Sequence, residues 1–112
     1  MIPIDDQVIQ QKYINGVLKR AEHHAPAVCG VAPSIIGHMT PFVDPGTMAA
    51  RPYGGHLGNI VRAEFGGRRI VFRYEHDTAK IEAREGSLKG PVLAEFDNET
   101  PHARLNEFFS SL

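Results

Sequence analysis

Four side chains in the middle of the chain have the chemistry of a ligand site: Arg51, Tyr53, His56 and His38. Residues 26–58 contain only one other charged residue, Asp44. A guanidinium group binds a carboxylate or a phosphate through paired hydrogen bonds. We therefore expect Arg51 to anchor a small anionic ligand, with the tyrosine and the two histidines as polar groups beside it.

Cys29 is the only cysteine, which excludes a disulfide within the chain and a zinc site built from several cysteines. It could act as a nucleophile beside His38 or His56, but a reactive thiolate needs an electropositive, partly exposed setting. Residues 27–31 are small and apolar instead, which favours a buried and unreactive thiol. We expect no catalytic residue at this position.

The remaining histidines and glycines do not predict a metal or nucleotide site. His23 and His24 are neighbours, and adjacent side chains on a helix point about 100° apart, so they cannot easily bind one ion. The glycines of residues 54–58 precede a strand rather than a helix and lack the lysine of a phosphate-binding loop. His76 and His102 are expected on the surface without a functional neighbour. We expect no metal and no cofactor.

The length and composition are those of one globular domain, which we assign to residues 1–112. Lys and Arg number 12 and Asp and Glu 13, so the net charge of -1 does not favour a nucleic acid or an anionic membrane as partner. No apolar run approaches the roughly 20 residues that cross a bilayer, and the first residues lack the features of a signal peptide. We expect a small cytoplasmic, bacterial protein.

The first predicted element is a helix over about residues 6–24, in which apolar residues recur at three- and four-residue steps. Asp5 is a favourable N-cap, and Pro26 ends the helix. Gly16 lowers helix stability by about 1 kcal/mol relative to alanine. Either another backbone approaches closely there, or the helix is split in two.

Two alternating segments, residues 59–65 and 68–75, flank a Gly-Gly pair and predict a tight hairpin. With Phe65 opposite Arg68, the apolar side chains of both strands share one face. A third strand over residues 79–84 joins this face after a second turn.

In the second turn we expect Tyr74 to lie opposite Ala79. Residues 92–96 predict a fourth strand, and Pro91 at its start is typical of a sheet edge because proline cannot donate to the ladder.

The opposite face of the first three strands carries charges of both signs, interrupted by Ile60 and Val71: Arg62, Glu64, Arg69, Arg73, Glu75, Lys80, Glu82 and Arg84. In this register Glu64 lies directly across from Arg69. Cross-strand ion pairs are the expected arrangement on such a solvated face. An excess of two positive charges without an aromatic platform does not predict nucleic-acid binding.

A last helix follows Thr100 and Pro101, with apolar residues at i, i+3, i+4 and i+7 from Leu105 to Leu112. The predicted fold class is α+β, with an N-terminal helix, an irregular apolar segment, a four-stranded antiparallel meander sheet and a C-terminal helix. Both helices are expected on one face of the sheet, where their apolar sides are buried.

Residues 26–58 form the irregular segment, which holds five of the eight prolines and six of the eleven glycines. Short helical turns are expected near residues 33–39 and 47–50. The segment is too apolar to stay in water, so it either folds over the core or forms a pocket wall or partner surface.

Two functions from different classes follow. The first is a non-catalytic binding or assembly module that forms a homodimer. The middle segment contains more apolar surface than so small a domain can bury, so we expect part of it to lie in the dimer interface. The apolar residues expected there are Met39, Phe42, Met48 and Tyr53. The second is a protein or small enzyme that binds a small anionic ligand between the sheet and residues 26–58. Since no nucleophile, base and stabiliser can be assembled, we prefer the module.

Overall fold

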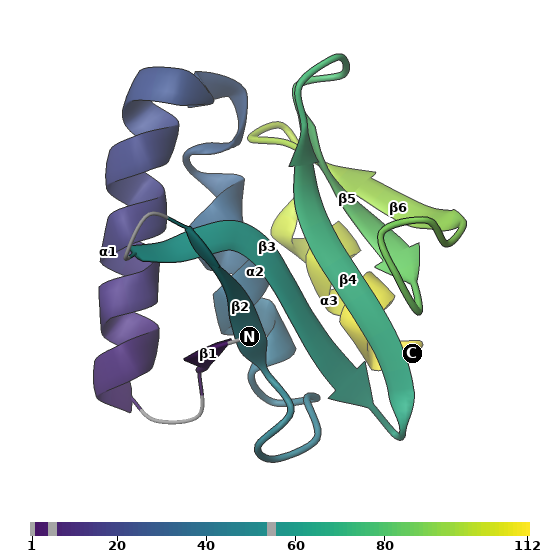
Figure 1. The fold of residues 1–112 in the computed structure, drawn as a ribbon. Helices are drawn as coiled ribbons and strands as arrows, with labels where there is room; N and C mark the ends of the chain where they lie inside the picture. The colour runs from purple at the N-terminus through teal and green to yellow at the C-terminus, as the bar shows by residue number, and fades with distance from the viewer. Residues whose placement is uncertain (1, 5–6, 54–55) are drawn as a thin grey trace.

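The computed structural model describes residues 2–4, 7–53 and 56–112. Its elements are, in chain order, β1 (Ile2–Pro3), α1 (Gln7–His24), the 3-10 helix η1 (Pro26–Val28), α2 (Val31–Met39), β2 (Ala49–Tyr53), β3 (His56–Phe65), β4 (Arg68–Glu75), β5 (Lys80–Glu85), β6 (Val92–Phe96) and α3 (His102–Ser110) (Figure 1). Among the described residues, six strands form one antiparallel sheet in sequence order. The predicted α+β class and its meander of β3 to β6 are confirmed.

The core lies between the helices and one face of the sheet. Phe109 of α3 contacts the rings of Phe65 on β3 and Phe72 on β4, at centroid distances of 5.8 and 5.9 Å. Phe108 meets Phe96 of β6 edge-on at 5.3 Å. All five rings are buried, and burial of one such side chain contributes about 1.5–3 kcal/mol. The apolar face predicted from the alternation is therefore the face that receives α3.

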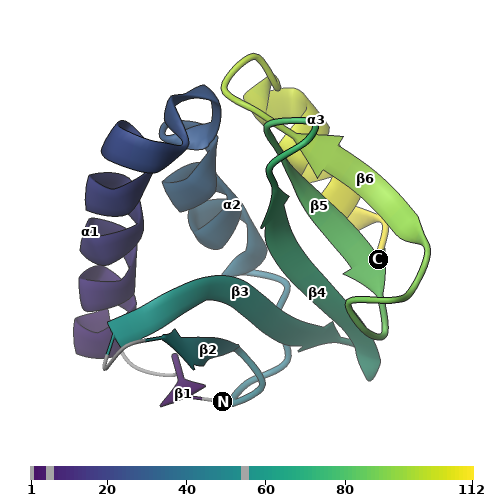
Figure 2. The ribbon, with the colours of Figure 1, turned by 45° about the horizontal axis from the view of Figure 1, so that its top comes forward.

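The other face of the sheet, called the open face below, points away from the helices. Figures 1 and 2 place α2 and α3 behind the sheet and α1 beyond α2. Along the described residues, no helix covers the open face, and none is long and apolar enough to span a membrane.

The first hairpin has the predicted register, with Phe65 opposite Arg68 and Glu64 opposite Arg69. Gly66 and Gly67 close it with φ angles of 62° and 81°, which a residue with a side chain rarely adopts. The Gly-Gly pair therefore fixes the pairing of β3 with β4.

The second turn differs from its prediction by two residues. Tyr74 lies opposite Ile81, not Ala79, because the four-residue turn consists of residues 76–79 and so includes Ala79, whose φ is 54°. A shift of two leaves every side chain on its predicted face. Ile81 and Ala83 therefore still join the apolar face.

The middle segment is more regular than expected: the helical turn predicted near residues 33–39 is part of a longer helix, whereas the one predicted near residues 47–50 is wrong, because residues 49 and 50 begin a strand. It contains α2, whose buried side chains are Val31, Ala32, Ile35, Ile36 and Met39, and the strand β2, which adds to the edge of β3. Pro33 lies in the first turn of α2, where a backbone N–H has no helical partner, so it does not break the helix. Met48 is also buried, so the segment packs over the core of its own chain.

Helix α1 runs unbroken through Gly16, so the prediction of one helix is confirmed and the alternative of two is wrong. The N-cap predicted at Asp5 lies outside the described residues.

Asn98, in the loop between β6 and α3, ties that loop to the start of α2. Its Oδ1 accepts hydrogen bonds from the backbone N–H groups of Gly30 and Val31 at 2.8 and 3.0 Å. Its Nδ2 donates to the carbonyl of Pro26 at 2.8 Å, and its own N–H donates to the carbonyl of Ala27 at 2.8 Å. One side chain thus caps α2, which has no side-chain cap of its own.

Candidate functional site

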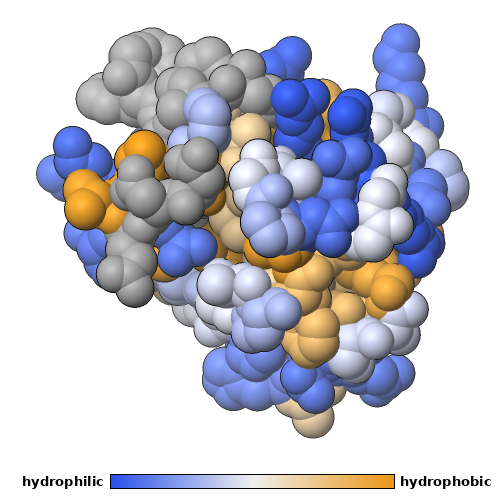
Figure 3. Space-filling model, turned by 90° about the horizontal axis from the view of Figure 1, so that it is seen from below, coloured by the Kyte–Doolittle hydropathy of each residue, from blue (hydrophilic) through white to orange (hydrophobic). Residues whose placement is uncertain are grey.

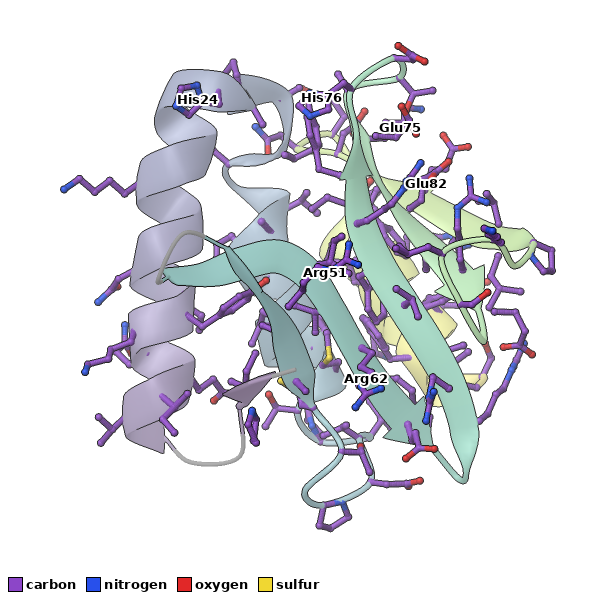
Figure 4. The ribbon with its side chains drawn as sticks, viewed as in Figure 1. His24, Arg51, Arg62, Glu75, His76 and Glu82 are labelled. Atoms are coloured by element: carbon purple, nitrogen blue, oxygen red, sulfur yellow. The ribbon has the colours of Figure 1, made fainter. Side chains whose placement is uncertain are left out.

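The structure does not gather the four predicted ligand-binding side chains. Arg51 is exposed on β2 and projects from the open face, because its neighbour Ala50 is buried on the other (Figure 4). His38 lies on α2, on the helical side of the sheet. Tyr53 and His56 pair on β2 and β3, but their side chains lie outside the described part of the chain.

The histidines make contacts that the sequence did not predict. His38 donates from Nδ1 to the carbonyl of Ser34 at 2.9 Å, and its ring stacks on His102 at 5.3 Å. His76 meets the ring of Tyr74 edge-on at 4.8 Å. His76 and His102 are both exposed, as expected, although each makes a ring contact that the sequence did not predict. The His38–His102 contact joins α2 to α3, and His76 also interacts electrostatically with the neighbouring Glu75 carboxyl.

Cys29 is half-buried and receives a weak hydrogen bond from Asn98 Nδ2 at 3.7 Å. No three His, Cys, Asp or Glu side chains of the described residues come together as metal ligands. The described part of the chain therefore offers neither a nucleophile–base pair nor a metal centre.

The open face has one half in which its charges are paired. Glu82 of β5 is only 5% exposed although no described helix covers it. Its Oε1 lies 3.0 Å from Nη2 of Arg84 and 3.6 Å from Nε of Arg73. Arg73 Nη2 also lies 2.6 Å from Oε2 of Glu75. The pKa of Glu75 is lowered, mainly by the hydrogen bond from the backbone N–H of Asp77 and also by the positive charge of Arg73. The predicted cross-strand pairing is present between Arg73 and Glu82, whereas the other two ion pairs join residues of the same strand.

In the other half of the open face the arginines are unpaired. Arg51 on β2, Arg62 on β3 and Arg69 on β4 have no carboxylate oxygen within 4.0 Å among the described residues. The predicted pairing of Glu64 with Arg69 is present in the backbone register but not as an ion pair. Figure 4 shows Arg51 and Arg62 on the viewer's side of the sheet, which is the open face. This half of the face is positively charged.

Val71 marks the boundary between the two halves. It lies opposite Arg62 on one side and Arg84 on the other, and Arg69 and Arg73 flank it along β4. Although it points to the open face, Val71 is only 6% exposed. The aliphatic stems of long charged side chains cover apolar surface in this way.

A depression of about 220 Å³ adjoins the unpaired arginines, and its lining consists of Pro3, Gly46, Thr47, Ala49, Arg62, Ala63, Glu64 and Arg69. The Thr47 hydroxyl donates to the carbonyl of Asp44 at 2.7 Å and accepts from the N–H of Glu64 at 3.0 Å, so it is satisfied within the chain. The charged groups left to meet a ligand are the two guanidinium groups and the Glu64 carboxylate.

The loop beside the depression is fixed by Asp44. Its carboxylate accepts the N–H groups of Gly66 and Gly67 at 2.9 and 2.8 Å, and these bonds lower its pKa. The wall of the depression is thus bonded to the hairpin.

Large apolar side chains are exposed at few described positions, which are Val8, Phe42 and Val92. Seen from below, hydrophilic side chains surround smaller apolar areas (Figure 3). Large exposed apolar side chains are therefore few among the described residues.

Sequence reasoning placed Arg62 and Arg69 on the charged face but assumed that they were paired. Val71 has arginines on all four sides, and among the described residues only Arg73 and Arg84 have a bonded carboxylate, a difference for which the sequence contains no signal.

The fold and this face define a small α+β domain with a charged, helix-free sheet surface. Residues 10–106 match the family described as "Integron cassette protein VCH_CASS1 chain". The match covers most of the chain, from α1 into α3, and the protein belongs to this family. Comparison with curated proteins finds no match. The family description names no activity, so a function has to be argued from the site.

Proposed function

We propose that the protein is a non-catalytic binding module that docks an acidic segment of another protein on the positive half of its open face. The observation that carries this is the contrast within one face: Arg73 and Arg84 have carboxylate partners, whereas Arg51, Arg62 and Arg69 have none among the described residues. An unpaired arginine group attracts and orients an acidic partner.

The size of the depression favours a side chain over a free small molecule. Pockets for small ligands usually measure about 300–1,000 Å³. The depression of about 220 Å³ is smaller and accommodates the end of one side chain. We therefore expect the anionic group to belong to a protein rather than to a free small molecule. We expect this partner protein in the cytoplasm.

A nucleic acid is a weaker candidate for the same surface. None of the open-face side chains that the structure describes is aromatic, so none of them offers a base a stacking platform, and Glu64 lies among the arginines. The experiment below therefore measures nucleic-acid binding as the competing result.

The test measures fluorescence anisotropy of a labelled oligoglutamate peptide and a labelled single-stranded oligonucleotide at low and moderate salt. We expect the peptide to bind and salt to weaken binding. A triple variant neutralises the unpaired arginines: Arg51→Gln, Arg62→Gln and Arg69→Gln. A matched control removes the same charge from exposed lysines elsewhere: Lys12→Gln, Lys19→Gln and Lys89→Gln.

We expect the arginine variant to lose peptide binding and the lysine control to keep it. Equal losses in both variants would mean that only net charge matters, which contradicts the proposal. Absence of peptide binding by the unmodified protein, or tighter binding of the oligonucleotide, would also overturn it.

A further inference from the structure

The two halves of the open face are related by an approximate two-fold arrangement around Val71. On one side, Glu82 lies opposite Arg73 and two residues before Arg84 on the same strand. On the other side, Glu64 lies opposite Arg69 and two residues after Arg62 on the same strand. Each half therefore contains one glutamate between two arginines at corresponding register positions, although Glu64 and Arg69 form a non-hydrogen-bonded pair, because their backbone groups bond to Thr47, Asp44 and Gly86 instead.

Only the first of these trios is closed. The Glu82 carboxylate bonds to Arg84 and lies within ion-pair distance of Arg73. Glu64 occupies the corresponding register position, yet none of its carboxylate oxygens lies within 4.0 Å of a guanidinium nitrogen of Arg62 or Arg69. The three residues of the second trio are instead among those that line the depression.

We infer that Arg62 and Arg69 together hold one carboxylate of the partner in the depression, in the position that Glu82 takes in the closed trio. This inference rests on the proposed function and names the group that the site recognises. Diagonal neighbours on adjacent strands are about 7–8 Å apart at the backbone, so two long arginine side chains reach one carboxylate from both sides.

Glu64 then has a defined part in recognition. It is the carboxylate of this chain best placed to enter the same position, so it competes with the carboxylate of the partner. Removing its charge should strengthen binding more than removing a charge elsewhere on the face. Glu95 provides the comparison, because it lies opposite Glu82 on β6, is exposed, and forms no ion pair among the described residues.

Lysine variants separate a carboxylate site from simple charge attraction. Lysine keeps the charge but loses the planar pair of donors with which arginine binds a carboxylate. With labelled oligoglutamate as the probe, we expect Arg62→Lys and Arg69→Lys each to weaken binding by about ten-fold. Arg51→Lys should change binding by less than about two-fold, because Arg51 does not line the depression.

The second arm compares Glu64→Gln with Glu95→Gln. We expect the first to bind the peptide several-fold more tightly and the second to bind like the unmodified protein. Arginine Nε–Hε signals in NMR spectra, assigned through Arg62→Lys and Arg69→Lys, should shift on peptide addition for these two residues, and thermal unfolding of each variant shows that it is folded.

The outcomes distinguish this inference from the proposed function. If all three lysine variants bind equally well and both glutamine variants behave alike, attraction is diffuse, so the inference is wrong and the proposed function stands. If Glu64→Gln abolishes binding, Glu64 supports the site rather than competing, which also overturns the inference. Failure of the unmodified protein to bind the peptide would reject both.

Discussion

The carboxylate of Asp44 accepts a 2.8 Å hydrogen bond from the backbone N–H of Gly67, although the two residues are far apart in the sequence. A second bond to the N–H of Gly66 makes the interaction two-pronged. These bonds lower the pKa of Asp44 in the folded protein. Its contribution to stability is therefore complete above the pKa of an unfolded aspartate, about 4, and is lost as the pH falls through the lower folded pKa.

The first prediction is that Asp44→Ala lowers the melting temperature at neutral pH and that the difference from the unmodified protein shrinks as the pH falls below about 4. Thermal unfolding followed by circular dichroism across this pH range measures it. Asp77→Ala is the matched control, because Asp77 is exposed in the next turn and its side chain forms no hydrogen bond among the described residues. A pH-independent difference would contradict the assignment.

The second prediction concerns Gly67, whose φ of 81° is unfavourable for a residue with a side chain. Gly67→Val should destabilise the protein by about 1–2 kcal/mol, since a left-handed conformation carries this penalty. Urea unfolding gives the free energy. Gly37→Ala in α2 is the control: open space surrounds the added methyl group, and alanine favours a helix, so stability should hold or rise. If both variants changed the free energy of unfolding equally, the prediction that the backbone of Gly67 holds the hairpin turn would be wrong.

The sheet could be predicted because several independent signals agree on it. The Gly-Gly turn, the alternation on both sides and the apolar face all require Phe65 to lie opposite Arg68, as it does. No such signal fixed the position of the second turn, because a shift of two residues in the pairing leaves every strand residue on the same face of the sheet. The positive φ of Ala79 appears only in the structure.

The elements of the middle segment were less predictable for physical reasons. Helix α2 contains Pro33 and Gly37, which lower its propensity, and it is apolar over much of its surface, so no clear stripe appears. Strand β2 contains Pro52 and an irregular register beside Arg51. In both cases tertiary burial decides the conformation.

The candidate site was predictable only in part. The sequence placed Arg62, Glu64 and Arg69 on one face, and the register confirms this. Whether a cross-strand ion pair closes depends on side-chain conformations whose free energies differ by less than about 1 kcal/mol. A pattern of residue types contains no information about differences that small.

The third prediction is that Asn98→Ala destabilises the protein by about 2–3 kcal/mol, because three side-chain hydrogen bonds to the start of α2 and to η1 are lost at about 1 kcal/mol each. Asn106→Ala on the exposed side of α3 is the control and should have little effect. Urea unfolding measures both. Amide exchange should also become faster at Gly30 and Val31 in the Asn98 variant alone. Equal stability of the two variants would show that the loop does not hold α2.

The fourth prediction is the homodimer expected from the sequence. The structure leaves fewer of the proposed interface residues exposed than the sequence suggested. Met39 and Met48 are buried in the core of their own chain, so neither is available to a partner. Among the described side chains of the predicted interface, Phe42 remains accessible, with 39% of its surface exposed. If the chain dimerises through this segment, Phe42 lies in the interface, and burying it twice stabilises the pair.

Sedimentation over a range of concentrations measures the mass, with 12.4 kDa expected for the monomer. We expect the unmodified protein to have twice this mass at high concentration and Phe42→Asp to remain a monomer, because the interface would bury an unpaired carboxylate. Val8→Asp on α1 is the matched control, since Val8 is also exposed but lies outside the middle segment, and it should still dimerise. A mass of 12.4 kDa at every concentration would reject the dimer. Dissociation by Val8→Asp instead of Phe42→Asp would move the interface to α1.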